Sequence, residues 1–144
     1  MKTEFFLIRH AEPDYTIIDQ RHYKGFGNDL APITQKGVLE TENTSKNILL
    51  KNADIIITSP YTRTLQTASI LSKKLNIDLK VEIDLMEWIP DKTYMYDNYS
   101  MVVNWRNHYD ENNGKCTYKE DNFEEKDEII LRVKNVLKKY SNYS

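Results

Sequence analysis

The chain has 144 residues, of which 40% are apolar and 29% charged, and its formal net charge is −2. This length suits one domain, and the slight negative charge argues against nucleic acid or an anionic membrane surface as a partner. Cys116 is the only cysteine, which excludes an internal disulfide and favours a reducing, cytoplasmic compartment. The apolar run near the N-terminus is too short for a signal peptide or a membrane span, so we expect no membrane partner.

Strand-like and helix-like patterns alternate over the first part of the chain. In order, we expect a strand over 4–9, a helix over 34–51 capped by Thr34, a strand over 54–58, a helix over 62–76 and a strand over 79–83. Apolar residues mark the core side of the two helices: Ile48, Leu49 and Leu50 in the first, and Leu65, Ala68, Leu71 and Leu75 in the second. The alternation predicts an α/β fold, with a three-layer α/β/α arrangement around a mainly parallel sheet.

The segment 88–124 differs in character, because it is rich in tyrosine, asparagine, aspartate and tryptophan, and only 101–109 indicates a short helix. A long irregular segment in a compact domain is commonly functional, so we interpret 88–124 as a lid or substrate segment. The alternative is a loosely ordered surface excursion. A last helix is expected over 125–140, and since no linker or repeat divides the chain, we treat 1–144 as one domain.

Reactive and cationic side chains follow two of the expected strands. Arg9 and His10 end the first strand, and Arg63 comes shortly after the strand over 54–58. Open α/β sheets bind ligands at the carboxyl ends of their strands. A histidine with a fixed tautomer is a competent nucleophile toward phosphorus, and guanidinium groups fit phosphate oxygens. An Arg-His pair alone favours a structural histidine and a surface ion pair, but the second arginine favours a phosphate pocket.

Four sequence blocks resemble those of the histidine phosphatase (phosphoglycerate mutase-like) superfamily. They are Arg9-His10-Ala11-Glu12, the segment Leu30 to Gly37, Ser59-Pro60-Tyr61-Thr62-Arg63 with Gln66-Thr67-Ala68, and Leu85-Met86-Glu87. The blocks occur in the family's order and cover most of residues 4–87. Beyond residue 88 the resemblance is limited to the expectation of a helix. The resemblance implies a phosphoglycerate mutase-like sheet.

The resemblance also implies roles for individual residues. His10 is the residue that becomes phosphorylated, and Arg9 and Arg63 bind the phosphoryl oxygens. Glu87 is the general acid for the leaving alcohol and then the base for water, although its residue type alone suggests an exposed loop carboxylate. Thr16 stands where relatives often carry an asparagine that binds phosphate, and its hydroxyl replaces one hydrogen bond.

Substrate specificity is expected to reside in the loops 13–29 and 88–124. The candidate substrate-binding residues are Tyr15, Arg21, Tyr23, Lys24 and Trp88. We interpret His22 and His108 as solvated surface histidines, with a place at the pocket mouth as the alternative for His22. Neither has a cysteine or another histidine at metal-ligand spacing, so we expect no metal and no cofactor.

The sequence departs from the family at its end. Family members carry a second pocket histidine in a Val-x-x-His-Gly-like segment, on a strand that lies between those ending at His10 and at Ser59; this sequence reaches Ser144 before such a segment. Three alternatives remain: the chain is a piece of a longer reading frame, the two flanking strands pair directly, or a partner molecule fills the gap. Unpaired sheet edges also predict a homo-oligomer as one outcome.

We therefore expect a phosphoric monoester hydrolase that works through a phosphohistidine on a small phosphorylated metabolite. A phosphatase is favoured over a mutase because the segment after His10 lacks the Trp-Asn pair of the cofactor-dependent mutases. Activity should be weak or absent, since loss of one phosphate-contacting donor costs about a hundred- to a thousandfold in rate. One alternative is a non-catalytic phosphate-binding or regulatory module, and another is an inactive chain whose sheet stays open.

Overall fold

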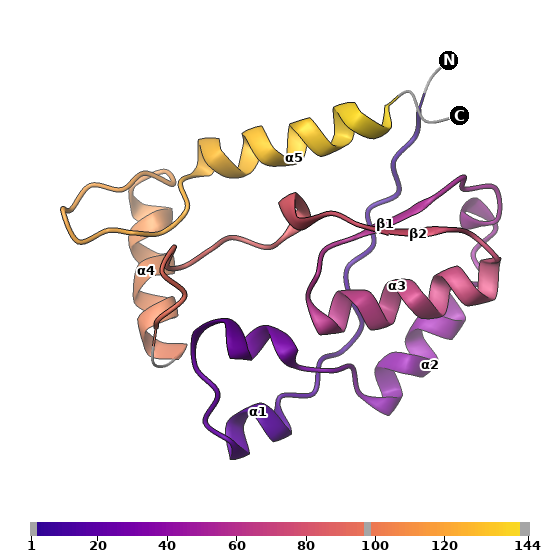
Figure 1. Cartoon of the computed structure of the whole chain (residues 1–144), viewed down its shortest axis with the longest axis horizontal. Helices are drawn as coiled ribbons and strands as arrows, with labels where there is room; N and C mark the ends of the chain where they lie inside the picture. Colours follow the sequence, from indigo (N-terminus) through magenta and orange to yellow (C-terminus); the bar gives the residue numbers. More distant parts are fainter. Residues whose placement is uncertain (1–2, 97–98, 142–144) are drawn as a thin grey trace.

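The computed structural model describes residues 3–96 and 99–141. A small parallel sheet of β1 (Ile56–Thr58) and β2 (Leu79–Val81) lies between two groups of helices (Figure 1). Helices α2 (Gln35–Thr44) and α3 (Thr62–Leu75) lie on one side of the strands and α5 (Lys126–Tyr140) on the other (Figure 1). The remaining elements are α1 (Thr16–Gln20), α4 (Tyr99–Glu111) and the 3-10 turns η1 (Gly25–Leu30), η2 (Ile48–Leu50) and η3 (Ile83–Leu85). The expected mixed α/β fold with parallel pairing is confirmed.

Helix α3 connects the two strands and matches the predicted helix closely. Ala68 and Leu71 of the expected apolar stripe are buried. The helix ends at Asn76, whose φ of 56° is the left-handed conformation that asparagine tolerates at a helix end. Since β1 ends at Thr58 and α3 starts at Thr62, the first turn of α3 lies near the carboxyl end of β1.

Helix α2 begins as predicted but is shorter. Thr34 caps it, since its Oγ1 accepts a hydrogen bond of 2.9 Å from the backbone N–H of Gly37. The helix ends at Thr44, and the Asn47 side chain caps a separate 3-10 turn, which interrupts the helix. The expected apolar side over 48–50 is therefore wrong in part: Ile48 and Leu49 are 68% and 60% exposed, and only the third residue is buried.

The strand predicted over 4–9 is absent. Within the described part of the chain the sheet consists of β1 and β2 alone, and residues 4–9 have no regular secondary structure. The side chains of 5–8 are exposed, Leu7 by 92%. A strand needs a neighbour to accept its N–H groups, and no described strand lies in register beside this segment. Direct pairing of the two flanking strands, one of the three alternatives, is therefore also wrong for this structure.

The segment 88–124 is packed rather than loose. It contains α4 and an aromatic cluster in which Phe123 is fully buried, with ring centroids 5.8 Å from Tyr109 and 5.9 Å from Trp88. Residues 97 and 98 of this segment lie outside the described residues. The helix α5 then starts with a capping box formed by Glu125 and Glu128. The described helices include none that is long and apolar enough to cross a membrane.

We expect the exposed run 5–8 to promote self-association, because apolar side chains on an unpaired segment favour pairing between molecules. Leu7→Lys should weaken concentration-dependent association in size-exclusion chromatography with light scattering. Because Leu7 is 92% exposed, the substitution should change the free energy of unfolding of the protein by less than about 0.5 kcal/mol. The matched control is Leu39→Lys on α2, where the side chain is 59% exposed. A wild-type chain that stays monomeric at every concentration would contradict this expectation.

The Asp91 carboxylate predicts a dependence of stability on pH. Burial raises the pKa of Asp91, but hydrogen bonds from Thr93 and Asn122 outweigh it and leave the pKa below its ordinary value. A carboxyl with a lowered folded-state pKa stabilises the fold above its unfolded pKa, and this contribution is lost as the pH falls below about 4. Asp91→Asn should therefore reduce the fall in the free energy of unfolding, measured in urea, as the pH is lowered. Asp54→Asn, at an exposed position, is the control and should leave this fall unchanged. Equal acid slopes in wild type and Asp91→Asn would refute this role.

Candidate active site

The backbone around His10 is held by α2 and α3 rather than by a sheet. The N–H of Ala11 donates to Thr67 Oγ1 on α3 at 3.0 Å. The N–H of Thr34, the cap of α2, donates to the Glu12 carbonyl at 2.9 Å. Two helices therefore fix His10 even though the segment that leads to it is unpaired.

Close approach of α2 to this segment depends on a glycine. A Cβ placed on Gly37 would lie 2.9 Å from the Glu12 carbonyl oxygen and 3.2 Å from the Ala11 Cβ. A larger residue at this position would push the helix away from the backbone that follows His10. The Gly37 that closes the second sequence block is thus a packing requirement of the site.

One hydrogen bond fixes the tautomer of His10. Its Nδ1 lies 2.8 Å from the carbonyl oxygen of Ala11. A carbonyl only accepts, so Nδ1 carries the proton and Nε2 keeps its lone pair in the neutral ring. Nε2 lies 3.6 Å from Glu87 Oε1, and the imidazole is 9% exposed. The nitrogen able to attack a ligand therefore faces the predicted acid.

Arg63, in the first turn of α3, is the buried charge of the site. Its side chain is 4% exposed, with Nη1 3.0 Å from Asp29 Oδ1 and Nη2 3.2 Å from Glu87 Oε2. The guanidinium carbon lies 4.7 Å from the centroid of the Tyr61 ring. Its Nε is buried and has no hydrogen-bond partner in the described structure. The structure thus brings His10, Arg63 and Glu87 together, and the protein leaves the guanidinium with spare donor capacity.

Burial shapes the other titratable groups around Arg63. It raises the pKa of the Asp29 carboxyl, although the hydrogen bond from Arg63 opposes this rise. It also raises the pKa of the Tyr15 and Tyr61 hydroxyls, which stay neutral as a result. The net result is one guanidinium between two carboxylates in a wall of neutral aromatic side chains.

Asp29 is a site residue that the sequence patterns did not single out. It lies in η1, directly before the block that starts at Leu30, and its carboxylate is the nearest partner of Arg63. An acidic residue at the edge of that block is the only sequence signal for it. Its partner stands 34 positions away, so residue spacing gives no sign of the contact.

Arg9 and Thr16 take other places than the centre of this cluster. Arg9 lies with His10 on a hollow of about 130 Å³ that Thr41, Thr67 and other residues of α2 and α3 line. Its side chain has no ion pair or hydrogen bond among the described residues. Thr16 is exposed at the start of α1, and its N–H donates to Asp14 Oδ1 at 2.9 Å. Their proposed contacts with phosphate stay predictions.

The candidate substrate residues divide into two groups. Tyr15 lies close enough to Arg63 for that charge to act on its pKa. Arg21 Nη1 donates to Tyr23 Oη at 3.1 Å, and both are exposed beside Lys24 on the same loop.

Trp88 and His108 are part-buried and packed within the 88–124 segment, and a substrate contact of Trp88 stays a prediction. The Trp88 indole N–H donates to the Glu124 carbonyl at 2.9 Å. His108 Nε2 lies 2.9 Å from Asp121 Oδ2, and the ring stacks on Tyr118 with the side chain 15% exposed. The expectation that His108 is a solvated surface histidine is therefore wrong, because a carboxylate and an aromatic ring hold it. His22, in contrast, is exposed at a turn, with φ of 51°.

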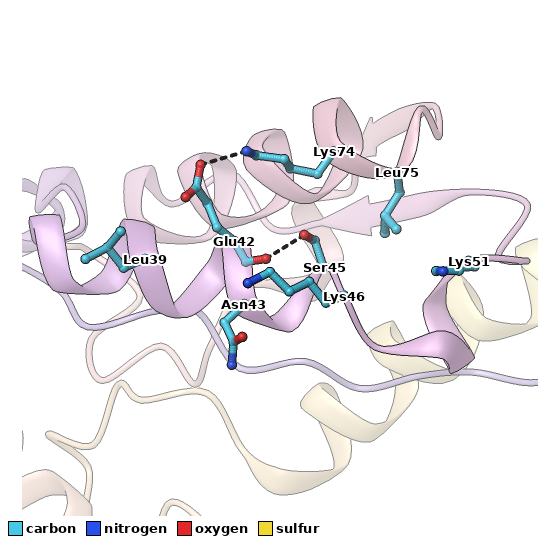
Figure 2. Close-up of a pocket in the computed structure, with 8 residues that line it drawn as sticks. All are labelled: Leu39, Glu42, Asn43, Ser45, Lys46, Lys51, Lys74 and Leu75. Carbon is cyan, nitrogen blue, oxygen red and sulfur yellow. Dashed lines mark hydrogen bonds and ion pairs between the residues drawn. The ribbon is translucent and has the colours of Figure 1, made fainter.

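The larger surface hollow lies elsewhere. It measures about 710 Å³ and opens between the C-terminal halves of α2 and α3, where Lys74 pairs with Glu42 at 2.8 Å (Figure 2). None of its lining residues lines the hollow beside His10. Across the described ranges we find no group of three or more histidine, cysteine, aspartate or glutamate side chains that could hold a metal ion.

Comparison with a protein-family model identifies the class to which this arrangement belongs. The model of the histidine phosphatase superfamily (branch 1) matches residues 5–143, so the chain belongs to that superfamily. No curated protein matches the chain.

Solved structures agree on the fold. A mycobacterial glucosyl-3-phosphoglycerate phosphatase with inorganic phosphate aligns with a TM-score of 0.67 at 12% identity, covering 94% of this chain and 61% of that one. An Escherichia coli protein provisionally named as an alpha-ribazole-5'-P phosphatase aligns at 0.61 and 17%, covering 95% and 66%. Bacillus stearothermophilus YhfR aligns at 0.61 and 17%, covering 93% and 67%. This chain thus spans less than two thirds of the length of the mycobacterial phosphatase.

The geometry predicts that Glu87 competes with anions for Arg63. Glu87→Gln should bind inorganic phosphate more tightly, because it removes a carboxylate 3.2 Å from the guanidinium. Since the Glu87 side chain is 59% exposed, solvent screens the effect, and we expect a gain of about two- to fivefold in isothermal titration calorimetry. Glu111→Gln on α4 is the matched control. Weaker binding by Glu87→Gln than by wild type would contradict the competition.

Proposed function

We propose that the chain is a phosphomonoester hydrolase that works through a phosphohistidine on His10. The observation that carries the proposal is the tautomer of His10, whose Nδ1–H is held by the Ala11 carbonyl while Nε2 faces the cluster of Arg63 and Glu87. Membership of the histidine phosphatase superfamily supports the same chemistry.

The first step of the proposed reaction forms a bond between His10 Nε2 and phosphorus. The nitrogen lone pair attacks as the ester P–O bond breaks, and the leaving oxygen takes a proton from the Glu87 carboxyl group. Arg63 offsets the charge on the phosphoryl oxygens, assisted by Arg9 from the segment that leads to His10. The Nδ1–H remains on the Ala11 carbonyl and keeps the ring oriented throughout.

The second step returns the enzyme to its starting state. Water gives a proton to the Glu87 carboxylate and attacks phosphorus, the P–N bond breaks, and its electron pair returns to Nε2. The acid and the nucleophile are already 3.6 Å apart. A phosphate ester monoanion that binds Arg63 replaces the contact of Glu87 with the guanidinium and gives its proton to the freed carboxylate. The product phosphate takes this proton back when the carboxylate returns to Arg63.

The proposed substrate is a small phosphorylated metabolite. The names of two structural neighbours describe phosphatases of small organic phosphates. Tyr15, which lies close to Arg63, and the exposed pair of Arg21 and Tyr23, with Lys24, supply hydroxyl and cationic groups for its recognition. We propose a low rate, because an anion must compete with two carboxylates for one buried guanidinium.

That same competition favours a second candidate function, a phosphate-binding module without turnover. Asp29 and Glu87 both contact Arg63, so the resting site holds its cation neutralised. A regulatory module requires anion binding that depends on Arg63 and no chemistry at His10. The two candidates therefore differ in whether His10 becomes phosphorylated.

Substitution of His10 distinguishes the hydrolase from the phosphate-binding module. His10→Ala should lower hydrolysis of p-nitrophenyl phosphate by at least about 10³-fold, because the nucleophile is lost. It should also abolish an acid-labile phosphoryl label on the protein, detected by ³¹P NMR after rapid mixing. His22→Asn is the control at an exposed histidine, since asparagine tolerates the positive φ there.

Equal rates for wild type and His10→Ala would contradict catalysis by His10. Phosphate binding that is lost in Arg63→Met, with neither turnover nor label in the wild type, would favour the binding module instead.

A further inference from the structure

One arginine outside the cluster has every donor bound. All the N–H groups of Arg132 on α5 point at acceptors. Its Nε and Nη2 donate to the Glu124 carboxylate at 2.5 and 2.8 Å. Its Nη1 donates to the carbonyls of Asp84 and Met86 at 2.7 Å each, and Nη2 also donates to the Glu87 carbonyl at 3.1 Å. The side chains of Arg132 and Glu124 are 13% and 5% exposed. The three carbonyls belong to Glu87 itself and to the residues that lead to it.

Glu124 holds the other end of the same segment. Its Oε2 accepts a hydrogen bond of 3.3 Å from the N–H of Ile89, and its own N–H donates to the Ile89 carbonyl at 2.8 Å. Its carbonyl accepts from the Trp88 indole at 2.9 Å. The pair of Arg132 and Glu124 therefore holds the backbone on both sides of Glu87 by hydrogen bonds.

The Glu87 side chain lacks such support of its own. It is 59% exposed, and its ion pairs run to His10 and Arg63, the two groups with which it must cooperate. Whether its carboxyl can reach these two groups therefore depends on where the backbone of 84–89 lies, and the Arg132 guanidinium holds that backbone. A lysine could not replace it, because an ammonium has three donors and no planar fork.

We propose that Arg132, fixed by Glu124, is a positioning residue that holds the Glu87 carboxyl within reach of His10 Nε2. This inference rests on the proposed function, in which Glu87 protonates the leaving group. The same helix also carries Lys139, which pairs with Glu82 at 2.6 Å. That ion pair fastens α5 to the end of β2 without touching the carbonyls of 84–87, so it provides a matched control for helix docking.

The test compares two substrates in the full chain. Protonation by Glu87 matters for the alkyl ester β-glycerol phosphate and little for p-nitrophenyl phosphate, whose leaving group departs without a proton. Arg132→Lys should lower kcat/KM on β-glycerol phosphate by about 10²-fold, as expected for a displaced catalytic group, and lower kcat/KM on p-nitrophenyl phosphate by much less. We compare kcat/KM because it reports the first step alone, whereas kcat also includes hydrolysis of the phosphohistidine, in which Glu87 acts with either substrate. Lys139→Met should leave the ratio of the two rates unchanged. An equal fall on both substrates, or no fall, would overturn the inference.

A second variant tests whether the loss of activity comes from misfolding. Arg132→Met leaves the buried Glu124 carboxylate without its cation, so the double variant Glu124→Gln/Arg132→Met removes both charges together. It should show the same substrate-dependent loss while unfolding cooperatively in urea. A normal rate ratio in this folded double variant would also overturn the inference.

If the wild-type chain hydrolyses neither ester, the proposed function fails, and the positioning role is decided by a structural readout. In the wild type and in Lys139→Met we expect a nuclear Overhauser contact between the His10 ring and the Glu87 side chain, whose atoms Nε2 and Oε1 lie 3.6 Å apart. Arg132→Lys should lose this contact. Its persistence at full intensity would refute the role of Arg132.

Discussion

The site depends on placing one guanidinium in the protein interior. Arg63 is brought there because β1 ends where α3 begins, and the burial is tolerated because Asp29 and Glu87 supply negative charge. The part-buried Asp29 carboxylate holds one side of the guanidinium in place, which we call the fixed side. On the other side, the exposed Glu87 carboxylate can be replaced by another anion, and we call this the exchangeable side. The exchangeable side faces His10, and this favours the proposed anion site over a structural ion pair.

Arg132 and Arg63 show how a structural guanidinium group differs from the one that we propose binds a ligand. Every N–H of Arg132 has an acceptor from the protein, whereas Arg63 has a buried Nε without one and an Nη2 that contacts an exposed side chain. Arg132 has no free donor and holds the backbone of 84–87 in place. Arg63 retains capacity for another acceptor, and the planar fork of arginine suits phosphoryl oxygens.

The sequence predicted well what is encoded locally. The cap at Thr34 and the extent of α3 follow from neighbouring residues, and the blocks around His10, Arg63 and Glu87 indicated which side chains would meet. The strand over 4–9 was wrong because a strand exists only beside a partner, which no local pattern supplies. Asp29 and Arg132 were missed for a related reason, since both act on residues distant in sequence and neither follows a recognisable spacing.

The central claim is that Arg63, beside His10, receives a phosphoryl group. The most direct measurement follows the guanidinium Nε–H resonances of Arg63 and Arg132 in ¹H–¹⁵N spectra while inorganic phosphate is added. We expect the Arg63 resonance to shift until phosphate saturates the site, and the Arg132 resonance, whose donors are already bound, to stay in place. An Arg63 resonance that does not move at saturating phosphate would contradict phosphoryl binding by Arg63.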